Sequence, residues 1–152
     1  MDGTFDDFLA TISITKIAAC AELVGLMERL FEATLEHVKM RNQFGRPLSK
    51  FQVIQHRLAD AYANLELSRS HLLRLAALKD TDENYEQMIS GAKAFISKSA
   101  RALAEDAVQL HGGMGMTDEY DVGLYLKRAR VLEASFGNTA YCRNRFASLG
   151  GY

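Results

Sequence analysis

Two short stretches contain residue types that could bind a ligand, and the first is QLHGGMGM at 109–116. It holds three glycines in four positions and closes a segment with helical periodicity. Glycine has no Cβ, so such a turn can let a ligand approach the backbone, but glycine also ends helices. A dinucleotide fingerprint needs a preceding strand and a P-loop ends in Gly-Lys-Ser/Thr, and neither is present. From spacing alone, a helix end with a tight turn is the favoured interpretation.

The second stretch is RNQFG at 41–45, where Arg41 follows a long helical pattern. A guanidinium is always charged and can meet phosphate oxygens in bidentate fashion. The same side chain can instead complement the dipole of the helix end that it occupies. The residues alone favour the second role.

The elements that must position these residues are predicted to be helices. Apolar residues recur at helical spacing over about 12–40, 49–79 and 83–111, with Ser49 as an N-cap and a polar turn at 80–84. A shorter helix capped by Thr117 or Asp118 is expected to reach about 134, and a last one follows Asn138 to about 147. No segment alternates with period two. We predict an all-α fold, an up-down four-helix bundle with one short extra C-terminal helix.

Length and composition suggest one ordinary globular domain over residues 1–152, with about 1–10 as an N-terminal extension and 148–152 as a frayed tail. The formal net charge of −1 gives no sign of a nucleic-acid partner, and no apolar run is expected to span a membrane. Cys20 and Cys142 form no disulfide framework, which favours a reducing, cytoplasmic location. The four histidines have no metal-ligand spacing, so no metal site is expected.

Three strings together resemble one family: RNQFGRPLSKFQVIQHRLAD at 41–60, DAVQLHGGMGMTDEY at 106–120 and LKRAR at 126–130. They are similar to signatures of the C-terminal helical bundle of the flavin-dependent acyl-CoA dehydrogenases, over about residues 10–146. The resemblance implies FAD bound across a subunit boundary, an acyl-CoA substrate that loses hydrogen from its α and β carbons, and a dimer or tetramer. An unrelated bundle would require all three strings to match by coincidence.

The resemblance also assigns cofactor-binding positions. Arg41 would reach the FAD pyrophosphate, and the glycine turn would contact the ADP half, so that it both holds a nucleotide and ends a helix. Phe44 would lie beside the flavin, and Asn138 replaces a threonine of the family pattern. The full set of expected cofactor contacts is Arg41, Asn42, Gln43, Phe44, Gln52, Gln109, Leu110, His111, Gly112, Gly113 and Asn138.

The catalytic position departs from the family. Phe136 stands where the family has the glutamate that abstracts the α-proton, and a phenyl ring accepts no proton. Some members carry the base on the first helix of the bundle, where this chain has Thr15. Lys16 takes the place of an arginine on the substrate side. We therefore expect no catalytic residue in this chain; the nearby acids Asp118, Glu119 and Glu133 are expected to be exposed helix carboxylates.

The N-terminal helical domain and middle β-barrel of the family have no counterpart in this sequence, so we expect the chain alone to be inactive. It would be an excised C-terminal domain or a non-catalytic partner in a heteromeric dehydrogenase. The alternative is an assembly module that has lost flavin chemistry. In either case we expect a dimer or tetramer built on the helices that carry Leu58 and Ala100.

Overall fold

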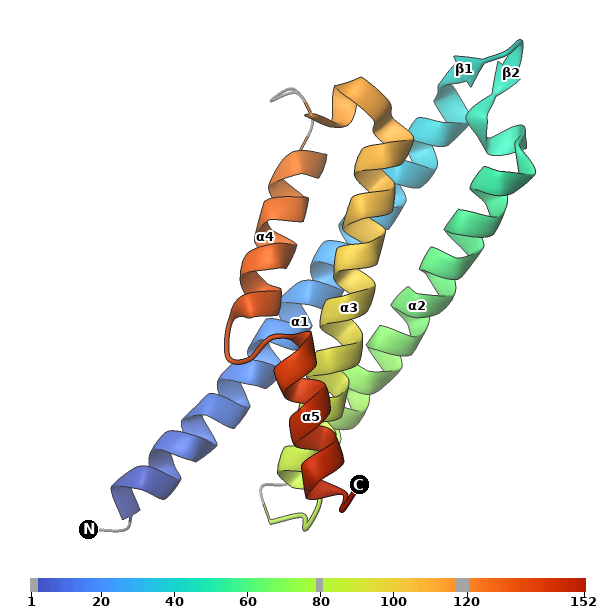
Figure 1. Cartoon of the computed structure of the whole chain (residues 1–152). Helices are drawn as coiled ribbons and strands as arrows, with labels where there is room; N and C mark the ends of the chain where they lie inside the picture. The colour runs from blue at the N-terminus through green and yellow to red at the C-terminus, as the bar shows by residue number, and fades with distance from the viewer. Residues whose placement is uncertain (1–2, 79–80, 117–120) are drawn as a thin grey trace.

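The computed structural model describes residues 3–78, 81–116 and 121–152, and these residues form a helical bundle (Figure 1). The long helices are α1 (Gly3–Met40), α2 (Gln52–Ala77) and α3 (Tyr85–His111). The shorter helices are α4 (Val122–Ala134) and α5 (Thr139–Leu149). Two 3₁₀ turns complete the fold: η1 (Leu48–Lys50) lies just before α2, and η2 (Gly112–Met116) directly follows α3. The predicted all-α class and bundle architecture are confirmed.

The helices run up and down in chain order, so α1 and α3 point the same way and their C-terminal ends meet at one end of the bundle (Figure 1). The central helix is α3, which packs against all four other helices. The short helices α4 and α5 follow one another along α3 and together fill the fourth position of the bundle (Figure 1). The core lies between these helices and includes Leu23, Met27, Leu65, Ile96 and Ala100.

The first connection contains a small hairpin that the sequence analysis did not predict. The strands β1 (Asn42–Gln43) and β2 (Arg46–Pro47) pair antiparallel, and the turn between them is Phe44-Gly45, both with positive φ. Such a two-residue turn matches the twist of a hairpin. The expectation that Ser49 caps the next helix was wrong, since η1 intervenes and Phe51 is the N-cap of α2, with no side-chain hydrogen bond.

The remaining helix ends agree with the sequence to different degrees. The first helix begins at Gly3 rather than near 12, so the described part of the expected N-terminal extension is helical. Asn138 caps α5 as expected, because its side-chain oxygen accepts the backbone N–H of Tyr141 at 2.9 Å. Thr117, Asp118 and Glu119 lie outside the described residues.

Within the described residues, α1 contains one stretch, Ala10–Met40, that is long and apolar enough to cross a membrane, with a mean hydropathy of 1.5. The sequence analysis did not anticipate this. Of its most apolar window, 44% is buried inside the bundle. The core helix of a bundle meets the same criterion, because one of its faces is covered by its neighbours.

Candidate cofactor site and catalytic-position cavity

The ends of α1 and α3, the hairpin and the two 3₁₀ turns enclose a hollow of about 510 Å³. We call it the Arg41 hollow. It is lined by His37, Arg41, Gln43, Leu48, Leu110, His111, Gly112 and Gly113. Six of these eight residues were predicted as cofactor contacts from separate stretches of the sequence, and the fold brings them together.

Arg41 is held at the junction of the first helix and the hairpin. Its backbone N–H donates to the carbonyl of His37 at 2.9 Å, and its own carbonyl accepts the N–H of Leu48 at 2.9 Å. The guanidinium therefore sits at the negative end of the α1 dipole, as the simpler interpretation requires, and also lines the hollow. The two roles proposed for Arg41 are compatible.

The glycine turn ends α3 and forms one wall of the hollow. Gly112 has φ +62° and ψ −142°, a backbone conformation that favours glycine, and its N–H donates to the carbonyls of Gln109 and Val108. A Cβ on Gly113 would meet nothing within 4 Å. A Cβ on Gly115 would lie 3.0 Å from His111 Cβ and 3.1 Å from the Val108 carbonyl oxygen. Close packing therefore explains the glycine at 115, whereas the described residues leave room for a side chain at 113.

Two histidines stack inside the hollow, with ring centroids 4.1 Å apart and planes inclined by 25°. His111 is 6% exposed, and its Nδ1 lies 2.9 Å from the carbonyl oxygen of Ala107. Because a carbonyl only accepts, Nδ1 carries the proton in this contact. Burial, His111 and Arg41 lower the pKa of His37 below its ordinary value.

The other predicted cofactor residues do not line the hollow. Asn42 donates to the Met40 carbonyl at 3.4 Å, and Phe44 is 91% exposed at the hairpin tip, edge-on to Phe51. Gln52 and Gln109 are exposed at the same end of the bundle. Asn138 lies elsewhere, in the turn between α4 and α5, and its side-chain oxygen is used to cap α5. The roles predicted for these residues remain predictions.

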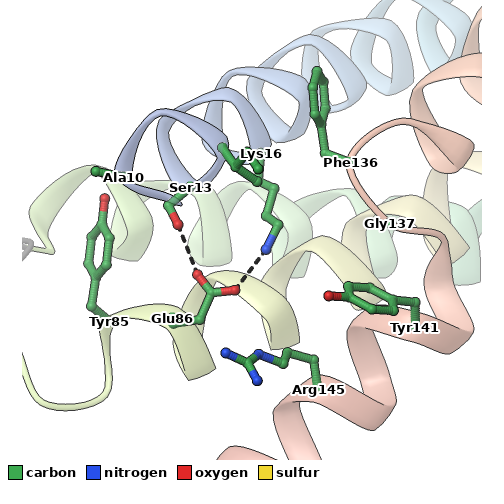
Figure 2. A pocket seen from close by; sticks show the side chains of 10 residues that line it. Ala10, Ser13, Lys16, Tyr85, Glu86, Phe136, Gly137, Tyr141 and Arg145 are labelled. Atoms are coloured by element: carbon green, nitrogen blue, oxygen red, sulfur yellow. Dashed lines mark hydrogen bonds and ion pairs between the residues drawn. The ribbon is translucent and has the colours of Figure 1, made fainter. Parts of the chain in front are cut away.

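A second cavity, of about 600 Å³, lies between α1, the start of α3, and α5 (Figure 2). We call it the Phe136 cavity. Its lining residues are Ala10, Ile12, Ser13, Lys16, Tyr85, Glu86, Phe136, Gly137, Tyr141 and Arg145. It thus contains both positions that the resemblance placed on the substrate side, Lys16 and Phe136.

Lys16 is 4% exposed, and its charge is matched inside this cavity. Its Nζ donates to Glu86 Oε1 at 2.7 Å, and the Ser13 hydroxyl donates to Glu86 Oε2 at 2.8 Å. Figure 2 shows both side chains directed at Glu86, while the ring of Phe136 points away from it. Because Glu86 neutralises the ammonium, Lys16 has no spare charge to offer an anionic substrate.

Phe136 is 45% exposed and has φ +59°, an uncommon conformation for a residue with a side chain. The neighbouring candidates for a base are engaged otherwise. Glu133 accepts the Thr139 hydroxyl at 2.9 Å and lies 3.6 Å from Arg101, and the Thr15 hydroxyl donates to the Thr11 carbonyl at 2.7 Å. Among the described residues, Glu86 is the single carboxylate that lines the cavity.

The turn that carries Phe136 is anchored by Lys93, which has no exposed surface. Its ammonium donates to the carbonyls of Leu132 at 2.8 Å and Glu133 at 3.3 Å, and to the Ser97 hydroxyl at 3.0 Å. These carbonyls belong to the last turn of α4, which has no following helical N–H to bind them. Burial lowers the pKa of Lys93, and burial also raises the pKa of the nearby Cys20 to about 12.

Comparison with known proteins identifies the fold and the family together. The family model of the acyl-CoA dehydrogenase C-terminal domain matches residues 5–148. The chain belongs to the acyl-CoA dehydrogenase family.

Among relatives of this acyl-CoA dehydrogenase domain, the probable acyl-CoA dehydrogenase YngJ of Bacillus subtilis is 36% identical over 135 residues, which are 89% of this chain and 36% of that protein. The mitochondrial isovaleryl-CoA dehydrogenase of Oryza sativa is 31% identical over 86% of this chain and 32% of its own length. The chain therefore spans about a third of these relatives.

Two solved structures share the fold of the acyl-CoA dehydrogenase domain. Butyryl-CoA dehydrogenase from Megasphaera elsdenii superposes with a TM-score of 0.87 at 27% identity, over 94% of this chain and 37% of that one. PigA with FAD and proline gives a TM-score of 0.88 at 30% identity, over 95% and 38%. The first of these neighbours is named as a dehydrogenase, and the second is described with FAD bound.

Sequence analysis missed three polar residues of this acyl-CoA dehydrogenase domain. His37 was detectable, because it lies four residues before Arg41 and so shares its helix face. Glu86 and Lys93 gave no local signal, since their partners are 70 and 39 residues away. Within the described residues, no group of three or more His, Cys, Asp or Glu is placed to hold a metal ion.

Proposed function

We propose that this chain contributes the Arg41 hollow to an FAD shared across a subunit interface, in a protein that dehydrogenates an acyl-CoA thioester between its α and β carbons. The observation that carries the proposal is the convergence of six predicted contacts on that hollow, from helix ends 70 residues apart in the chain. The FAD would accept the hydride from the substrate, and this chain would supply groups that bind the FAD.

The residues of the hollow fit a dinucleotide in two respects. Arg41 offers a permanent, forked cation to phosphate oxygens. Gly113 leaves open space beside the backbone that the described residues do not fill. A ligand or a neighbouring subunit that carries the ligand would occupy that space, so the glycine has a reason that packing within the chain does not supply.

We further propose that this chain supplies no catalytic base. Phe136 takes the usual position, and both carboxylate oxygens of Glu86 already accept hydrogen bonds, from the Lys16 ammonium and the Ser13 hydroxyl. A partner chain would then supply the base, and this chain would act as its cofactor-binding partner. We place it in the cytoplasm.

The FAD proposal is tested by the visible spectrum of the chain assembled with its partner domains or chain, incubated with FAD and then desalted. Flavin bands are expected in the wild type and should weaken in Arg41→Ala. Lys39→Ala is the matched control, because Lys39 is exposed in the last turn of α1, two residues before Arg41, and does not line the hollow. A folded but colourless wild-type protein would instead favour the assembly module.

The missing base is tested by Phe136→Glu in the protein assembled with its partner domains or chain. Exchange of the acyl-CoA α-proton with deuterated solvent isolates the base step from flavin reduction. The substitution should speed the exchange if position 136 faces the substrate. An equally fast wild-type exchange that Glu86→Gln abolishes would place the base on this chain.

The oligomer interface is expected on the helices that carry Leu58 and Ala100, which are α2 and α3. These two residues themselves are buried in their own bundle, so other side chains of those helices would form the contact. On α2, the exposed apolar side chains of Tyr62 and Leu73 lie eleven residues, about three helical turns, apart on one flank, and we propose that this flank contacts a second copy. Light scattering that shows only monomer at high concentration would refute it.

A further inference from the structure

The Arg41 hollow concentrates positive or protonatable groups at one point. Arg41 directly follows α1, His37 lies in the last turn of that helix, and His111 comes from the end of α3. The hairpin and η1 contribute Gln43 and Leu48, which do not titrate, and the described lining contains no carboxylate. The hollow is therefore built to respond to a negative ligand.

The two stacked histidines cannot both be charged at low cost, because two like charges 4.1 Å apart repel each other. His111 is the more buried ring, and its Nδ1–H is committed to the Ala107 carbonyl. His37 is half-buried, and no backbone group fixes its ring among the described hydrogen bonds. Because His37 is the more exposed ring, it is the one of the two that gains a proton at the lower cost of desolvation.

We propose that His37 couples ligand binding to proton uptake, so that a diphosphate in the Arg41 hollow binds as this histidine becomes an imidazolium. The inference rests on the proposed function, because it takes the FAD diphosphate as the ligand. Nothing in the family resemblance assigned a role to His37, and its role here follows from its stack on His111 and its place beside Arg41.

The sign of the effect follows from the charges around His37. In the free chain its pKa is lowered, by burial first and then by His111 and Arg41. A dianionic diphosphate would offset the repulsion from Arg41 and raise that pKa in the complex. The complex then holds more protons than the free chain, so affinity rises as pH falls between the two pKa values. One proton limits the gain to about tenfold per pH unit.

The test measures the FAD affinity of the chain assembled with its partner domains or chain, by fluorescence polarisation between about pH 5.5 and 8. FAD suits this range because both of its phosphates are diesters with fixed charge, whereas a terminal phosphate such as that of ADP titrates near pH 6. Affinity is expected to rise about five- to thirtyfold from the upper to the lower pH. His37→Asn should flatten this profile to within about twofold, while His56→Asn, exposed on α2, should keep it.

A second measurement does not depend on a variant. The NMR titration of the His37 ring in the wild type should shift to higher pH when FAD is added. An unchanged titration, or a His37→Asn profile as steep as the wild type, would overturn the inference while leaving FAD binding in place. Absence of FAD binding at every pH would overturn the proposed function and this inference together.

Discussion

Alanine substitutions at two glycines of the same turn should have opposite consequences. At Gly115 the new Cβ would lie 3.0 Å from His111 Cβ, 3.1 Å from the Val108 carbonyl oxygen and 3.4 Å from Val108 Cα. Two of these atoms are backbone, so they cannot move away cheaply, and overpacking of this kind costs about 1–3 kcal/mol. At Gly113 the Cβ would meet nothing, and φ is not positive. Alanine there should be neutral or stabilise the fold by up to about 1 kcal/mol, because it restricts the unfolded chain.

Urea unfolding followed by circular dichroism measures the free energy of unfolding of both variants, and thermal unfolding gives their Tm. For a chain of this size, Gly115→Ala should lower Tm by about 2–10 °C and Gly113→Ala should leave it unchanged or raise it by up to about 4 °C. For FAD binding, the larger effect should come from the substitution at Gly113. Gly113→Ala should weaken it about tenfold or more, because the Cβ occupies the space proposed for the ligand. A Gly113→Ala protein of normal stability and normal FAD affinity would refute the role assigned to that open space.

Three further outcomes test the packing around the Phe136 turn. Lys93→Met should lower the free energy of unfolding by about 2–4 kcal/mol in urea titration, because it leaves the buried carbonyls of the last turn of α4 without a donor. Stability should fall as pH rises from about 9 to 12, since the thiol of Cys20 ionises at 9.0 when unfolded but near 12 when folded, so that the unfolded state holds fewer protons. The free energy of unfolding should fall by about 4 kcal/mol over this pH interval, and by less in Cys20→Ala. The lowered pKa of Lys93 acts in the opposite direction and offsets part of this fall. Asn138→Ala should cost about 1 kcal/mol, measured by thermal unfolding, because α5 loses its side-chain cap.

Much of the fold could be predicted from the sequence, because the determinants are local. Apolar spacing of three and four residues identified the helices, and Phe44-Gly45 and Gly112 marked their ends. The errors occurred where two local signals competed. Ser49 has the chemistry of an N-cap, but Pro47 and the 3₁₀ turn after it delay the helix to Gln52. The paired strands are only two residues each, too short for a period-two pattern to be visible.

The candidate site also depends on both local sequence and tertiary packing. The sequence by itself, through its resemblance to the family, named the candidate residues around Arg41 and the glycine turn, each at a single helix end. Only the tertiary structure decided that these ends meet, because α1 and α3 run in the same direction and pack side by side. That packing stacks His37 on His111, pairs Lys16 with Glu86 and buries Lys93 against the end of α4. Such contacts join residues 39 to 74 positions apart, and the rotation and register of each helix set them, which no local pattern encodes.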